Sequence, residues 1–161
     1  MTAPAVLQAN RPALTAKATM AISDILAAES GANGFVPGSS VIAYQYNRPN
    51  WVAKPMGEVG KELGVQRVIV IDVTEYRLRD PGNQYTWDGV ANFLVGVYEC
   101  DSTLPDDVAF QKRIEVKFPD AGGYTPTDLP EAAVNTELTR RACERAAWLF
   151  FTHEEKNALK Y

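Results

Sequence analysis

Residues 68–73 constrain the fold of this chain more than any other stretch. They form an almost continuous apolar run, rich in Val and Ile, in which Asp72 is the one polar residue. A run of this kind is typical of a strand in the middle of a sheet, with cover on both faces. The sequence therefore predicts a sheet built around residues 68–73.

Two further strands follow this run. Residues 74–79 are amphipathic and are expected to leave the core, and a turn follows at residues 80–83. A long strand is predicted over residues 85–99. From residue 108 to 118 apolar residues alternate with charged ones, which indicates a strand with one packed face and one wet face. These three strands are predicted to form an antiparallel meander.

Helices and one more strand complete the prediction. Apolar residues recur at helical spacing over residues 13–29, and a short second helix is expected to follow Pro55 and to end at Gly64. Between these helices, residues 39–46 are short, β-branched and aromatic, which favours a strand. After a loop at residues 119–130, a closing helix has an apolar stripe made by Leu138, Ala142, Ala146 and Leu149.

The predicted order is thus helix, strand, helix, three strands, helix. This order favours an α/β (α+β) domain, with a mixed sheet that contains the antiparallel meander and helices mainly on one face. A length of 161 residues suits a single domain over residues 1–161, and residues 1–12 and 153–161 are expected to be flexible.

Composition narrows the classes of partner. The formal net charge of −4 provides no basic field for a phosphate backbone, so no nucleic acid is expected to bind. No apolar run reaches the length of a membrane-spanning helix. The N-terminus lacks the pattern of a secretory leader, and Cys100 and Cys143 are predicted to be free thiols.

Residues 57–75 carry the one family resemblance in the sequence. They read GEVGKELGVQRVIVIDVTE, a short helix, a glycine cap and an apolar strand. This stretch resembles the corresponding signature of the curli-assembly (CsgG-like) superfamily of bacterial envelope lipoproteins. That superfamily includes LpoB-like activators of penicillin-binding proteins and shares its fold with the N-terminal domain of TolB. The order of elements over residues 13–151 is similar to that of the family.

The resemblance implies a noncatalytic, envelope-associated domain that scaffolds a complex or binds a protein partner, including another copy of itself. It would be periplasmic or associated with the outer membrane, with a leader and a lipid anchor outside this chain. A cytoplasmic partner-binding module is the alternative. The long lipid-facing hairpins of the curli pore have no counterpart here, so no channel is implied.

Three carboxylates support a different hypothesis. Asp72 lies inside the apolar strand, and Glu75 and Asp88 are expected nearby on the same strand and its neighbour. Paired carboxylates can perform acid/base chemistry, so a small-molecule-binding or carboxylate-dependent enzyme that uses these three residues is the alternative function. The other interpretation is an ordinary ion pair, in which Arg67, Arg77 or a backbone group is the partner of Asp72.

No metal or cofactor is expected. Gly57, Gly60 and Lys61 do not have the spacing of a phosphate-binding loop, and they precede a strand instead of following one. Small residues there are expected to let the helix approach the sheet closely, with Gly64 in the left-handed conformation of a cap. The single histidine, His153, has no neighbouring residues that would complete a zinc site.

Aromatic residues are the candidates for contact with a partner. Rings near the ends of strands either anchor a partner surface or close the edge of a core. The candidates are Tyr44, Tyr46, Trp51, Tyr85 and Trp87. An open sheet edge, either the strand predicted at residues 39–46 or the one at residues 108–118, could also be extended by pairing with a neighbour.

Overall fold

The structure is a computed structural model that describes residues 13–104 and 107–154. Most of the predicted flexible ends, residues 1–12 and 155–161, lie outside the described residues. The elements are α2 (Leu14–Glu29), α3 (Gly38–Asn47), the 3-10 helix η1 (Pro49–Ala53), α4 (Met56–Leu63), β1 (Arg67–Arg77), β2 (Gly89–Glu99), β3 (Val108–Phe118), α5 (Glu131–Ala147) and the 3-10 helix η2 (Trp148–Phe150).

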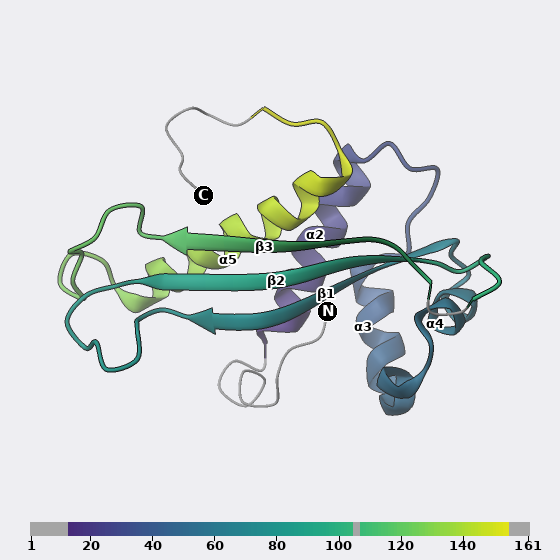
Figure 1. Ribbon diagram of the computed structural model, residues 1–161, viewed down its shortest axis with the longest axis horizontal. Coiled ribbons are helices and arrows are strands. Elements are labelled where there is room, and N and C mark those ends of the chain that lie inside the picture. Colours follow the sequence, from purple (N-terminus) through teal and green to yellow (C-terminus); the bar gives the residue numbers. More distant parts are fainter. Residues whose placement is uncertain (1–12, 105–106, 155–161) are drawn as a thin grey trace.

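The described strands form one antiparallel sheet in the order β1, β2, β3. Helices α2 and α5 lie together on one side of it (Figure 1), and α5 contacts α2, β2 and β3. The α+β class, the antiparallel meander and the placement of helices mainly on one face are therefore confirmed. Among the described helices, only α4 packs against the opposite face of the sheet, at its end near Val68; we refer to the rest of that face, toward the viewer in Figure 1, as the open face.

The position of β1 corrects two predictions. Among the described strands, β1 lies at an edge of the sheet, not in the middle. Its apolar run has Ile71 and Val73 buried under the helices, whereas Val70 lies half-buried on the open face. The strand also does not leave the core after Val73, because a bulge shifts the register and returns Tyr76 to the buried side.

The strand predicted at residues 39–46 is wrong, because this segment belongs to helix α3. No strand in the part of the chain that the structure describes lies beside it, and its packing against α2 overrides the local β propensity. The two helices meet closely at Gly38, where a Cβ atom would lie 3.2 Å from Met20 Cα. Tyr44 is buried and donates a hydrogen bond to Glu62 of α4 at 2.9 Å. Without this strand, the sheet is antiparallel throughout and not mixed.

Helix α4 approaches the sheet at a glycine, as predicted. A Cβ atom at Gly60 would lie 2.0 Å from Cys100 Sγ and 2.9 Å from Val68 Cγ2. Gly64 ends the helix with a φ of 70°, so its predicted left-handed cap conformation is confirmed. Cys100 and Cys143 are buried free thiols, also as predicted, and burial raises the pKa of Cys143 to about 12.

Arg141 is the one buried charged side chain among the described residues, 3% exposed. Its guanidinium donates two hydrogen bonds to Asp120, at 2.6 and 2.9 Å, and one to Glu137 at 2.9 Å. It also lies 4.7 Å from the ring centroid of Phe118. Arg141 therefore ties α5 to the end of β3 and to the turn that follows.

We predict that Gly60→Ala destabilises the protein by about 1–3 kcal/mol, since the added methyl group overpacks the contact with Cys100 and Val68. Gly34→Ala is the matched control, because nothing lies within 4 Å of a Cβ atom at that position. Urea unfolding monitored by circular dichroism measures both variants. Equal unfolding free energies for the two variants would contradict the close approach of α4.

We predict that Arg141→Met lowers the unfolding free energy by about 2–3 kcal/mol at pH 7, since hydrogen bonds to charged groups are lost. Hydrogen bonds from Arg140 and then from Arg141 lower the pKa of Glu137 from 4.5 to about 2. The stability that these bonds provide is present above pH 4.5 and is lost as the pH falls through 2. The difference in unfolding free energy between Arg141→Met and the wild type should therefore become smaller as the pH falls toward 2. Lys17→Met, a change at an exposed position of α2, controls for the loss of one positive charge.

Candidate functional site

Arg77 gathers the acidic residues near the end of β1 around one guanidinium group. It donates to Glu75 at 2.7 Å, lies 3.5 Å from Asp88, and forms a third ion pair with Asp80. Glu75 also accepts a hydrogen bond from the Asn92 amide at 2.7 Å. Two of the three carboxylates that the sequence singled out thus share one cation, an arrangement that favours a structural ion-pair network.

Asp72 stands apart from this network. It lies on the open face opposite Leu94 of β2, and desolvation raises the pKa of its carboxyl group. Neither of the two arginines that the sequence suggested as partners contacts Asp72. Arg67 lies 3.5 Å from Glu99, and Arg77 is bound to Glu75. Within the described part of the chain, the Asp72 carboxylate makes no ion pair or hydrogen bond, so the prediction of an arginine partner is wrong.

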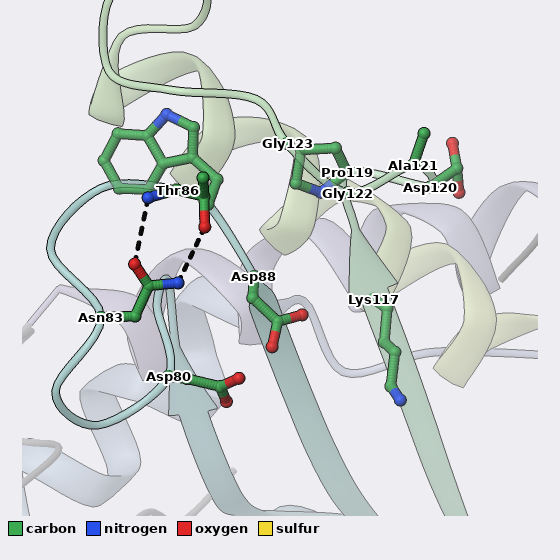
Figure 2. A pocket seen from close by; sticks show the side chains of 11 residues that line it. Asp80, Asn83, Thr86, Asp88, Lys117, Pro119, Asp120, Ala121, Gly122 and Gly123 are labelled. Carbon is green, nitrogen blue, oxygen red and sulfur yellow. Dashed lines mark hydrogen bonds between the residues drawn. The ribbon is translucent and has the colours of Figure 1, made fainter.

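A polar pocket of about 480 Å³ lies beyond the ends of the strands. Figure 2 shows Asp80 and Asp88 on one side of it, Lys117 of β3 on another, and the loop that follows β3 above them. Its lining comprises Asp80, Asn83, Thr86, Trp87, Asp88, Lys117, Pro119, Asp120, Ala121, Gly122 and Gly123. Asp80 and Asp88 are bound by Arg77 and Asp120 by Arg141, so most of its charge is already compensated within the protein.

The described residues contain no group of three His, Cys, Asp or Glu side chains that could hold a metal ion. The single histidine, His153, stacks on the Trp148 ring with the centroids 4.4 Å apart. The residues available for a ligand in the pocket are thus oxygen donors and one lysine, without a metal-binding arrangement among the side chains that the structure describes.

The five aromatic candidates do not form one surface. Tyr44 and Trp87 are buried, and the indole N–H of Trp87 donates to the Leu129 carbonyl at 2.8 Å. Trp51 is half-buried in η1. Tyr46 and Tyr85 are 85% and 81% exposed, but α3 and the turn between β1 and β2 lie toward opposite ends of the sheet (Figure 1). The structure therefore does not unite these rings in a contact site.

The outer edge of β3 is the most accessible part of the sheet. β3 is an edge strand, and no described strand pairs with its outer side. The register shifts at Ala109 and then continues without interruption from Phe110 to Phe118. Val108 and Phe110 are 39% and 41% exposed, although both are large apolar residues. This edge is one of the two that the sequence proposed; the other, at residues 39–46, does not exist, since those residues are helical.

A shallow, widely open groove lies beside the far end of the same strand. It has a volume of about 560 Å³ and is lined by Phe118 of β3 and by Ala132, Ala133, Thr136 and Glu137 of α5. Small side chains on the helix leave room for a ring from another molecule. The sequence analysis missed this groove, and the only available signal was the pair of adjacent alanines at the start of the closing helix.

No family model matches the chain, and a search of curated proteins finds no match. Within residues 13–104 and 107–154, no helix is both long enough and apolar enough to span a membrane, in agreement with the sequence analysis.

We predict that Asp72→Asn stabilises the protein at pH 7. Desolvation raises the pKa of Asp72 above its ordinary value of 3.8, so the folded state loses stability as the pH rises from 3.8 through the folded pKa. The asparagine amide carries no charge, so the variant does not lose this stability. The gain in unfolding free energy over the wild type should vanish below pH 3.8, the ordinary pKa of the carboxyl group. Urea unfolding at pH 7 and at acidic pH measures this gain. Asp24→Asn, at an exposed position of α2, is the control. A destabilised Asp72→Asn variant would indicate an unrecognised favourable contact.

Proposed function

We propose that this chain is a noncatalytic protein-binding domain that accepts a strand from its partner at the outer edge of β3. The observation that carries the proposal is the regular, exposed edge from Phe110 to Phe118, with an exposed aromatic ring at one end and an apolar groove at the other. Edge pairing derives affinity from main-chain hydrogen bonds, and pockets for side chains give it specificity.

The two edges of the sheet differ in how well they would accept a strand. The edge strand β1 is bulged after Val73, and a bulge is one of the devices by which proteins prevent pairing at an edge. On β3 the register shift lies at Ala109, outside the regular segment, and no proline interrupts residues 110–118. These differences favour β3 over β1 as the binding edge.

We place this binding domain in the bacterial envelope, as part of a larger complex. The support is the resemblance of residues 57–75 to the curli-assembly superfamily, together with the close packing of α4 at Gly60 and the glycine cap at Gly64. A leader that ends in a lipidation cysteine, encoded upstream of this chain, would support the periplasmic or outer-membrane placement. Its absence from the complete reading frame would favour the cytoplasmic alternative.

The alternative function is an enzyme or small-molecule-binding protein that uses Asp72, Glu75 and Asp88. The desolvated Asp72 carboxyl is the observation in its favour. Against it, Glu75 and Asp88 both form ion pairs with Arg77, an arrangement typical of a structural network. Alanine replacement of the three residues, without loss of an activity found by substrate screening, would remove this alternative.

We predict that extended peptides selected for binding to the protein will dock on β3. Titration of a selected peptide into ¹⁵N-labelled protein should shift the backbone amides of residues 110–118. Phe110→Glu should weaken binding at least about tenfold, because exposed aromatic rings often supply a large share of binding energy. Tyr85→Glu is the matched control, an exposed aromatic residue in the turn between β1 and β2. Shifts centred on Asp88 and the polar pocket, with no effect of Phe110→Glu, would refute the proposal.

A further inference from the structure

The middle of the open face carries one carboxylate and one guanidinium that form no ion pair with any described residue. Asp72 of β1, Leu94 of β2 and Arg113 of β3 are paired in register and form one row across the three strands. Asp72 and Leu94 are half-buried, and Arg113 is exposed. Since neighbouring strands are about 4.8 Å apart, the acidic and basic ends of this row lie about 10 Å apart, with an apolar residue between them.

The neighbouring charges on the same face are compensated within the protein. Arg77 is bound to Glu75 at 2.7 Å. Lys117 lies 3.1 Å from Glu115. Asp72 has no such compensation, and desolvation raises the pKa of its carboxyl group, so its negative charge lowers the stability of the folded chain. A positive charge from another molecule would recover this free energy, because a cation close to a carboxylate favours its charged form.

The open face has room for a helix over this row. Helix α4 packs against the same face of the sheet at Val68, four residues before Asp72 on β1. Four residues of a strand span about 13 Å. Packed helices are about 8–10 Å apart, so a helix placed over the row can lie beside α4 without displacing it.

We propose that the open face binds an amphipathic helix of a partner protein, which crosses β2 beside α4. A Lys or Arg side chain of this helix pairs with Asp72, an Asp or Glu side chain pairs with Arg113, and an apolar residue between them packs on Leu94. Positions i and i+7 of a helix share one face and are about 10.5 Å apart, close to the length of the row. Residues on one face of an extended segment recur at about 7 and 13 Å, so a helix fits the row better.

The charges of the open face favour a different protein over a second copy of this chain. Two copies stacked face to face, with β3 of one over β1 of the other, would pair the opposite ends of the two rows. The same stacking would place Arg77 over Lys117 and Glu75 over Glu115, since these residues lie in rows parallel to the first. Like charges brought together at an interface disfavour it, so the partner has a sequence of its own. This inference does not depend on the proposed function of the β3 edge.

Peptides selected on the whole chain from a displayed library with an Ala-rich, helix-favouring frame are the probe for this surface. Asp72→Asn and Arg113→Gln should each weaken the binding of a selected peptide about tenfold or more, because each variant leaves one charge of the helix unpaired. Asp72→Asn is expected to raise the unfolding free energy, so its loss of binding cannot result from misfolding. Asp24→Asn and Lys112→Gln change exposed residues away from the open face and should leave binding unchanged.

A double-mutant cycle identifies the pair at Asp72. Replacement of the peptide's Lys or Arg by Met should weaken binding to the wild type about tenfold and should have little effect on binding to Asp72→Asn. In ¹⁵N-labelled protein, the peptide should shift the backbone amides around Asp72, Leu94 and Arg113.

Several results would overturn the proposal. Selection that yields no helical binder refutes it, as does a selected helix that binds Asp72→Asn as tightly as the wild type or that shifts only amides of α3 or of the polar pocket. Binding that appears only after removal of residues 1–12 assigns the open face to that segment and refutes a partner protein. A dimer that Arg113→Gln dissociates assigns the face to a second copy. Strand binding at β3 is tested separately by the extended peptides, so either claim can fail alone.

Discussion

The packing of α5 across β2 and β3 is the interaction on which the rest of the structure depends. Leu138 and Val134 of this helix are completely buried, as is Val116 of β3, and Arg141 fastens the helix to the turn after β3. This packing fixes which face of the meander is covered. It also determines that Ile114 points inward while the neighbouring residues of β3 lie exposed at the edge.

A three-stranded sheet with helices on one side has two edges and an open face. In this chain, the two edges and the open face differ in structure. On the open face near the end of β1, charged side chains are compensated through Arg77. The β1 edge is bulged. The β3 edge combines a regular backbone with an exposed aromatic ring and a groove. The folding of one chain does not require these features. The proposed function rests on this asymmetry.

The parts of the fold that the sequence predicted are those that local chemistry determines. Alternation of apolar and charged residues defined β3, and the glycine cap at Gly64 defined the end of α4. Residues 39–46 were assigned to a strand because β-branched and aromatic residues favour one, but packing of Tyr44 and Gly38 against other helices overrides that preference. The edge position of β1 was missed because an apolar run reflects burial of the side chains and does not reveal how many strands pair beside it.

The candidate site shows the same limit of sequence reasoning. Asp72, Glu75 and Asp88 were selected by residue type, and only the structure shows that Arg77 holds two of them while Asp72 stays apart. The groove joins Phe118 to Ala133, residues of different elements, and no local pattern links them. Phe110 was assigned to a packed face by its alternation, and its exposure follows from its place at the uncovered end of an edge strand.

Intermolecular nuclear Overhauser effects between labelled protein and an unlabelled extended peptide selected for binding test the central claim most directly. We predict contacts between the peptide backbone and the β3 backbone over residues 110–118. Intermolecular contacts confined to other elements, with none along residues 110–118, would contradict it.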